Sequence, residues 1–165
     1  MRSLEKTAYS GMNASLTVDG DADHEQALSV VVPVYNSAAT LPQLLERLVR
    51  AIDSVTPDYE IILVDDGSRD DSWTVLQSLR ARYGDRMVAI QLMRNYGQHN
   101  ALMCGLAVAR GEYVVTMDDD LQNPPEEIPK LLAHIRNRRL DLVYGCPSDR
   151  SHAAWRNLGS RVVWH

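Results

Sequence analysis

LSVVVPVY, residues 28–35, is an almost unbroken run of apolar and β-branched residues. A strand with one face in water alternates apolar and polar residues, whereas a strand inside a parallel sheet is covered on both faces and is apolar throughout. The run therefore predicts a buried strand of a parallel sheet. Since parallel neighbours need long crossover connections, a helix is expected directly after it.

The next residues have the spacing of an amphipathic helix, with apolar side chains at i, i+3, i+4, i+7, i+8 and i+11. These residues are Leu41, Leu44, Leu45, Leu48, Val49 and Ile52. EIILVDDGS, residues 60–68, predicts a second buried strand that ends in a turn. The second helix has its apolar stripe at Trp73, Leu76, Leu79 and Tyr83, with Gly84 suited to its C-terminal cap.

The alternation continues to residue 145. MVAIQLM (87–93) predicts a third strand, and residues 98–110 predict a third helix with Gly111 as its left-handed cap. YVVTMD (113–118) and LDLVYG (140–145) predict the fourth and fifth strands. The fourth helix opens at Asn123, Pro124 and Pro125, and its buried face is Ile128, Leu131, Leu132 and Ile135. Regular alternation predicts an α/β fold, an open, mostly parallel sheet with helices on both faces.

Length and composition predict one folded domain. The chain has 165 residues, 45% hydrophobic and 24% charged, which are ordinary globular values. Residues 1–26 lack the apolar segment of a signal peptide and predict a flexible leader, residues 27–148 form the α/β domain, and residues 149–165 begin an amphipathic helix that stops in mid-pattern. No apolar run approaches the ~20 residues that cross a bilayer.

Charge is divided unequally along the chain. Residues 1–129 hold 10 Lys and Arg against 20 Asp and Glu, whereas residues 130–165 hold 7 against 2. An acidic body argues against nucleic acid as a partner, and the basic end suits phosphates or an anionic membrane surface. A solvated helix face explains the basic end equally well.

Polar residues follow each of the first four predicted strands. They are Tyr35 and Asn36, Asp65 and Asp66, residues 95–100, and Asp118 to Asp120. In an open α/β sheet ligands bind beyond the carboxyl ends of the strands, where the strand order reverses. In residues 95–100 a phosphate contact at a helix start and a cap with a tight turn are equally good interpretations, and His99 is expected to be structural.

Three consecutive aspartates need an explanation, since like charges repel. If the segment is extended, alternate side chains share a face, so Asp118 and Asp120 converge and Gln122 follows on the same side. Mg²⁺ takes one or two protein carboxylates together with substrate phosphates, which would neutralise the pair. The alternative is a hydrated, Asp-rich loop at the helix entry.

Several chemistries lack their motifs. GxGxxG after the first strand, GxxxxGK[ST] and GxSxG are all missing, which argues against a dehydrogenase, a P-loop ATPase and a serine hydrolase. Cys104 and Cys146 are far apart and have no His or Cys at metal-ligand spacing, so neither a zinc site nor a disulfide framework is predicted.

Three segments in order carry a family resemblance: VVVPVYN, ILVDDGSRDDS and RNYGQHNALMCGLAVARGEYVVTMDDDLQNPPEEIP. They resemble family 2 glycosyltransferases of the GT-A fold, which have a Rossmann-like sheet. Within that family they are similar to polyprenyl-phosphate sugar transferases, namely the bacterial undecaprenyl-phosphate aminoarabinose and glucosyl transferases and, more distantly, the dolichol-phosphate mannose synthases. The resemblance covers about residues 28–165 and implies that residues 27–148 bind a nucleotide sugar.

The resemblance implies a donor site. Pro33 and Tyr35 match positions that line the nucleobase pocket, Asp65 matches the acid that hydrogen-bonds the base, and Asp66 lies near the ribose. Asp118, which also contacts the nucleotide, joins Asp120 and Gln122 in the family's D-x-D-x-Q ligand set for Mg²⁺ or Mn²⁺.

Two positions depart from the family pattern. Asp119 replaces a small residue and is expected to face the donor sugar or solvent, and Ser37 replaces a Glu found in many relatives.

The resemblance also implies an activity, which is the inverting transfer of a sugar from a nucleoside diphosphate to a polyprenyl phosphate. UDP is the expected nucleotide. Arg156, with Asp118 and Asp120, is expected to be catalytic. Arg156 and Ser160 match the acceptor-phosphate pair, and Arg150 is the candidate for a second family arginine that is missing after residue 145.

The face of Trp155, Leu158 and Val162 would lie among lipid headgroups at the cytoplasmic side of the membrane, making the enzyme a peripheral one. A subunit contact in a homo-oligomer is the alternative use of that face. Two other functions stay open: a family 2 transferase with a polysaccharide or other hydroxyl acceptor, and a nucleotide- and metal-binding module without turnover.

Overall fold

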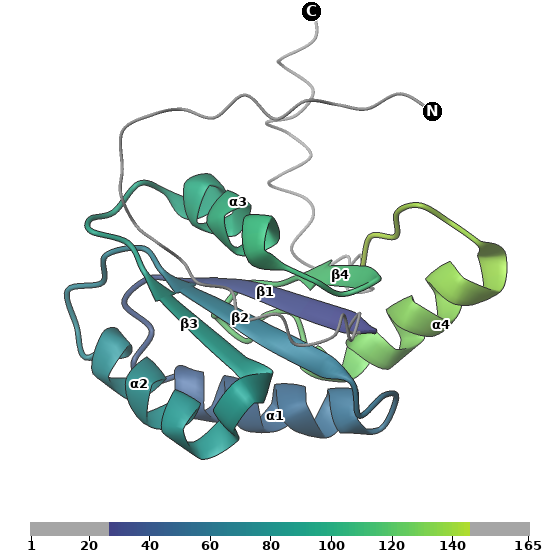
Figure 1. The fold of residues 1–165 in the computed structure, drawn as a ribbon, viewed down its shortest axis with the longest axis horizontal. Coiled ribbons are helices and arrows are strands. Elements are labelled where there is room, and N and C mark those ends of the chain that lie inside the picture. Colours follow the sequence, from purple (N-terminus) through teal and green to yellow (C-terminus); the bar gives the residue numbers. More distant parts are fainter. Residues whose placement is uncertain (1–26, 146–165) are drawn as a thin grey trace, which may run out of the picture.

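A four-stranded parallel sheet is the centre of the computed structural model, which describes residues 27–145 (Figure 1). The strands are β1 (Leu28–Val34), β2 (Tyr59–Asp65), β3 (Met87–Gln91) and β4 (Tyr113–Thr116). The helices are α1 (Leu41–Asp53), α2 (Ser72–Tyr83), α3 (Gln98–Val108) and α4 (Ile128–Arg138), with short 3-10 turns η1 (Gly84–Arg86) and η2 (Pro125–Glu127). None of these helices is long and apolar enough to cross a bilayer.

The strand order is β3-β2-β1-β4. The chain therefore steps outward from β1 to β2 to β3 and then returns to the other side of β1 to add β4. The β1–β2 ladder runs from Leu28 opposite Tyr59 to Val34 opposite Asp65, whereas the β1–β4 ladder ends where Val31 meets Thr116. Strand order reverses between β1 and β4, so the ligand-binding position of an open α/β sheet lies beyond their carboxyl ends.

Both faces of the sheet carry helices, as the sequence predicted. Helices α1 and α2 cover one face and α3 covers the other, with α4 packed beside α1 (Figure 1). All residues of β1 and β2 are buried, whereas β3 and β4 are partly exposed. The first face buries the leucine stripe of α1 with Leu76, Leu79, Ile128 and Leu132, and the second buries Val31, Ile62, Val64 and Ala101. The predicted α/β fold is confirmed.

The predicted role of Gly111 is wrong. Helix α3 already ends at Val108, and Ala109 leaves it in an extended conformation, so no left-handed cap forms at residue 111. A Cβ on Gly111 would lie 2.7 Å from the Leu28 carbonyl carbon and 2.9 Å from Ser29 Oγ. Glycine is needed there because the chain entering β4 passes directly against the backbone of β1. Gly84 does have a positive φ, at 63°, and caps α2 as expected.

The predicted fifth strand is absent from residues 140–145, which have no regular structure. Leu142 is 63% exposed and Tyr144 is 79% exposed, so their apolar side chains are not part of the described core. A strand exists only as part of a hydrogen-bonded ladder, and an apolar run predicts burial without naming a partner. The fourth helix also begins differently, since the 3-10 turn η2 at Pro125 precedes α4.

A buried carboxylate at the amino end of the sheet was not predicted. Glu60 is 1% exposed, and its Oε1 accepts hydrogen bonds from Ser29 Oγ and from the Arg110 N–H, both at 2.7 Å. Its Oε2 accepts one from Arg110 Nη2 at 3.2 Å, and Ser29 Oγ in turn accepts the Gly111 N–H at 2.8 Å. These bonds join β1 and β2 to the α3–β4 connection and so fix where β4 begins.

We predict that Glu60→Ala lowers the free energy of unfolding by about 3 kcal/mol, because it removes the acceptor of the buried Ser29 hydroxyl and the nearer of the two acceptors of the Arg110 N–H. Urea unfolding followed by circular dichroism measures the change. Glu46→Ala is the matched control, since Glu46 pairs with Arg50 on the surface of α1 and is 63% exposed; its effect should stay within about 0.5 kcal/mol. Equal losses in the two variants would contradict the role given to Glu60.

Candidate functional site

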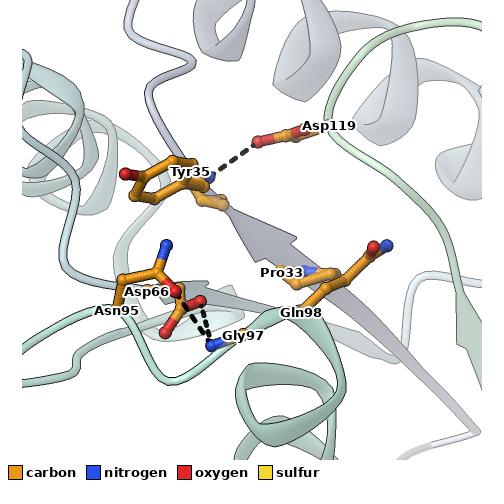
Figure 2. A pocket seen from close by; sticks show the side chains of 8 residues that line it. Pro33, Tyr35, Asp66, Asn95, Gly97, Gln98 and Asp119 are labelled. Carbon is orange, nitrogen blue, oxygen red and sulfur yellow. Dashed lines mark hydrogen bonds between the residues drawn. The ribbon is translucent and has the colours of Figure 1, made fainter.

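A pocket of about 200 Å³ lies at the carboxyl edge of the sheet, next to the point where strand order reverses (Figure 2). The lining residues come from the end of β1, from the connections that follow the four strands, and from the start of α3. They are Pro33, Val34, Tyr35, Asp66, Asn95, Gly97, Gln98 and Asp119. Three residues predicted for the nucleotide, Pro33, Tyr35 and Asp66, are therefore brought together here.

Pro33 lies on the edge of β1 that faces the pocket. In a parallel strand the N–H and C=O of one residue point to the same neighbour, and alternate residues point to alternate neighbours. Val31 O accepts the Met117 N–H from the β4 side, and Val34 O accepts the Asp66 N–H from the β2 side. Pro33 thus faces the β4 side, where the ladder has already ended, so its missing N–H costs no hydrogen bond.

Asp119 closes one side of the pocket by joining two connections. Its Oδ2 accepts a hydrogen bond from the Tyr35 N–H at 3.0 Å (Figure 2). The same oxygen accepts one from Ser37 Oγ at 2.5 Å. Its backbone O accepts one from Thr40 Oγ1 at 3.1 Å. Asp119 therefore holds the β1–α1 connection against the β4–α4 connection, a structural contact that the sequence prediction for this residue did not include.

The two aspartates after β2 have different surroundings. Asp65 is fully buried, and its carboxylate accepts hydrogen bonds from the Ser68 N–H at 3.1 Å and from Gln91 Nε2 at 3.3 Å. Asp66, 2% exposed, lines the pocket and accepts the Tyr96 N–H at 2.7 Å and the Gly97 N–H at 2.8 Å. Asp66 is thus the member of the pair in the described pocket, and the roles of both at a nucleotide stay predictions.

Gly67 brings the β2–α2 and β3–α3 connections into contact. Its φ is 65°, and a Cβ at this position would lie 2.5 Å from the Arg94 carbonyl carbon and 2.6 Å from Asn95 N. Any larger residue would push the two connections apart. Together with the two hydrogen bonds to Asp66, this contact fixes Gly97, whose φ is 94°, at the start of α3.

The premise of an extended aspartate segment is wrong. Strand β4 ends at Thr116, and Leu121 has a φ of 61°, so Asp118 to Asp120 lie in a loop. Gln98 Nε2 donates to Asp118 Oδ1 at 2.6 Å, and the Gln122 N–H donates to Asp120 Oδ1 at 2.9 Å. With Asp119 bound to the β1–α1 connection, the three carboxylates have three separate sets of partners.

The residues predicted to bind a metal fit an ion only if a substrate completes its coordination. Within residues 27–145, no group of three or more His, Cys, Asp or Glu side chains is placed to hold a metal ion. In that part of the chain Asp118 and Asp120 each accept a protein hydrogen bond through Oδ1 alone, which leaves each Oδ2 for another ligand. Two carboxylates completed by diphosphate oxygens are a normal Mg²⁺ site.

Two acidic side chains hold the connections around the pocket in place. Burial opposes ionisation of Asp70, but hydrogen bonds from Ser72 and from the Ala38 N–H outweigh it and keep the pKa of Asp70 below its ordinary value. The high density of Asp and Ser in residues 65–72 was the sequence feature that could have predicted these hydrogen bonds in the β2–α2 connection. A hydrogen bond from Arg47 lowers the pKa of Glu126 and joins α1 to η2.

The predicted acceptor-phosphate residues Arg150, Arg156 and Ser160 lie outside the described residues, as does the face of Trp155. Of the predicted site residues, the described part of the chain therefore includes those assigned to the nucleotide and the metal, and none of those assigned to the acceptor.

An open parallel sheet with a pocket beside its switch point defines an α/β domain with its ligand-binding position at the carboxyl edge of the sheet. The model of the family "Glycosyl transferase family 2" matches residues 29–161 of this chain. The chain belongs to glycosyl transferase family 2, as the motifs predicted.

Similar proteins share one name. The undecaprenyl-phosphate 4-deoxy-4-formamido-L-arabinose transferase of Pseudomonas savastanoi pv. phaseolicola is 46% identical over 136 residues, which are 82% of this chain and 40% of that protein. The protein of the same name from Shewanella sediminis is 52% identical over 136 residues, 82% of this chain and 41% of the relative. The chain thus spans about two fifths of the length of these relatives.

Solved structures agree with the GT-A fold. The crystal structure of S. aureus TarS 1-349 has a TM-score of 0.60 and 26% identity, over 74% of this chain and 38% of that one. Its complex with UDP-GlcNAc has a TM-score of 0.57 at 25% identity, over 76% and 37%. The mannosyltransferase PcManGT from Pyrobaculum calidifontis, with GDP-Man and Mn²⁺, is 22% identical with a TM-score of 0.58, over 68% and 33%, and shows likeness of fold alone.

We predict that Asp119→Ala speeds hydrogen exchange of the Tyr35 amide by at least tenfold, because the variant removes the acceptor of that N–H and frees the β1–α1 connection. Exchange measured by NMR at single residues tests this. Asp85→Ala, an exposed aspartate at the amino end of β3, is the control and should leave Tyr35 unchanged. An unaltered Tyr35 rate in Asp119→Ala would refute the contact.

Proposed function

We propose that this chain is the donor-binding part of an enzyme that transfers a sugar from UDP to undecaprenyl phosphate at the cytoplasmic face of the membrane. The observation that carries the proposal is the pocket at the β1–β4 switch point, lined by residues that match the family's nucleotide positions. The name shared by relatives at 46% to 52% identity supports the lipid phosphate acceptor, and it makes 4-deoxy-4-formamido-L-arabinose the first sugar to test.

The base and ribose have a suitable surface in the pocket. The Tyr35 ring is 41% exposed at the rim, next to the buried Pro33, so a planar base can stack on it. Asp66 is held by two backbone N–H groups and is oriented in advance to accept hydrogen bonds from the donor. The complex of TarS with UDP-GlcNAc, at 25% identity, supports a UDP-sugar as the donor.

The diphosphate needs a cation, because Asp66 and Asp119 give the pocket lining negative charge. We assign Mg²⁺ or Mn²⁺ to Asp118, Asp120 and Gln122, where the ion would neutralise the departing diphosphate as a Lewis acid. The protein residues hold the donor so that its anomeric carbon faces the acceptor. Asp118 and Asp120 contribute by binding the leaving-group side of the donor.

The acceptor is chemically suited to direct displacement. A phosphate monoester has a second pKa of about 6 and is largely dianionic at neutral pH, so it needs no general base. A phosphate oxygen forms the new bond to the anomeric carbon while the bond from that carbon to the diphosphate oxygen breaks, and its electron pair leaves with UDP. Attack opposite the leaving group inverts the configuration. Arg150, Arg156 and Ser160 are assigned to the acceptor phosphate, since arginine binds phosphate in bidentate fashion.

We predict that the full-length protein transfers radiolabel from UDP-4-deoxy-4-formamido-L-arabinose to undecaprenyl phosphate, and that the label then partitions into the organic phase. A hydroxyl acceptor on a polysaccharide would instead leave the label in water or in insoluble polymer. Omission of undecaprenyl phosphate is the control. Label that stays with the nucleotide in its presence would reject this donor and acceptor pair.

We predict that Asp120→Asn weakens UDP binding in saturating Mn²⁺ by at least tenfold, down to the affinity seen without metal, while the melting temperature stays within about 2 °C. Isothermal titration calorimetry with and without Mn²⁺ measures the difference. Asp58→Asn, an exposed aspartate just before β2 at the other end of the sheet, is the matched control. Equal UDP affinity in Asp120→Asn and the unmodified protein would remove Asp120 from the site.

A further inference from the structure

We propose that Gln98 is a positioning residue for Asp118. It binds one oxygen of the Asp118 carboxylate and leaves the other directed to the cation of the bound nucleotide diphosphate. The inference rests on the proposed function, because it requires a metal ion at Asp118.

The contact joins two elements that approach the pocket separately. Gln98 is the first residue of α3, and its side chain reaches out from the start of that helix at the pocket wall (Figure 2). Its Nε2 lies 2.6 Å from Asp118 Oδ1 in the connection after β4. The distance is short for an amide donor, as expected when the acceptor is ionised.

Asp118 differs from its acidic neighbours in how it is held. Asp66 and Asp119 accept backbone N–H groups of other connections, and Asp120 accepts the Gln122 N–H in its own turn. In the described part of the chain, the Asp118 carboxylate has one donor, and that donor is the side chain of Gln98. The direction of Asp118 therefore depends on a single exposed side chain rather than on the fold.

A neutral donor suits this task better than a charged one. Arg or Lys at position 98 would also bind the carboxylate, but its positive charge would repel the cation that Asp118 is to bind. The Gln98 amide orients the carboxylate without that penalty. Hydrogen bonds that fix a metal-binding carboxylate typically change metal affinity by about 10-fold to 100-fold when removed. Since this contact is exposed, the lower value is expected.

The test is a double-mutant cycle on Mn²⁺ binding. Gln98→Leu keeps most of the side-chain volume and removes the donor, and Gln98→Ala is the second variant. In the presence of UDP, free Mn²⁺ measured by electron paramagnetic resonance should show affinity about tenfold weaker in both. The melting temperature should not change in either variant. His99→Ala, which truncates the next residue of the same exposed helix turn, is the control and should bind Mn²⁺ normally.

The Asp118→Asn background completes the cycle. If Gln98 acts through Asp118, then Gln98→Leu should have no further effect there on the residual Mn²⁺ affinity. Equal Mn²⁺ affinity in Gln98→Leu and the unmodified protein, or a loss of the same size in the Asp118→Asn background, would overturn the positioning role and leave the metal site standing. Failure of the unmodified protein with UDP to bind Mn²⁺ would overturn the metal assignment and this inference together.

Discussion

The unequal length of the two ladders on β1 determines where this domain can bind a ligand. β1 pairs with β2 along its whole length to Val34, but its ladder with β4 ends at Val31. The last residues of β1 therefore have one free edge, and Pro33 occupies it without losing a hydrogen bond. Strand order also reverses at this place, and the pocket lies beyond the carboxyl ends of β1 and β4, where Asp119 joins the connections that follow these two strands.

The pocket is acidic in a protein proposed to bind a diphosphate. None of the eight lining residues is Lys or Arg, while Asp66 and Asp119 are both among them. These two carboxylates, and that of the nearby Asp118, are held by neutral donors: backbone N–H groups, the Ser37 hydroxyl and, for Asp118, the Gln98 amide. The fold thus keeps several negative charges close together without neutralising them. The electrostatic attraction of a cation to this pocket is therefore stronger than it would be if the carboxylates were paired in salt bridges.

The sequence predicted the strands and helices whose burial produces an apolar run or a regular spacing of apolar residues. The apolar runs of β1 and β2 and the stripes of α1 and α2 were predicted because covered strands and amphipathic helices leave direct patterns. The prediction of a fifth strand was wrong because the apolar run at 140–145 does not identify the strand with which it would form hydrogen bonds. The hydrogen-bond network of Glu60 was not predicted because residues 29, 60 and 110 are distant in sequence. The sequence predicted that Pro33, Tyr35 and Asp66 lie together at the carboxyl edge of the sheet, which the structure shows. It did not predict the direction of each carboxylate, since that depends on loop dihedral angles such as the positive φ of Leu121.

Positions 37 and 119 both depart from the family pattern, and they lie in contact in this structure. The resemblance has Glu in many relatives at position 37 and a small residue at position 119, whereas this chain has Ser37 and Asp119. Ser37 Oγ donates to Asp119 Oδ2, so the two residues that depart from the pattern are hydrogen-bonded to each other. The carboxylate now comes from the β4–α4 connection and reaches the Tyr35 N–H. Ser37 carries no charge and Asp119 carries the carboxylate, so the negative charge on this side of the pocket comes from the connection after β4 and at the same time holds the connection after β1.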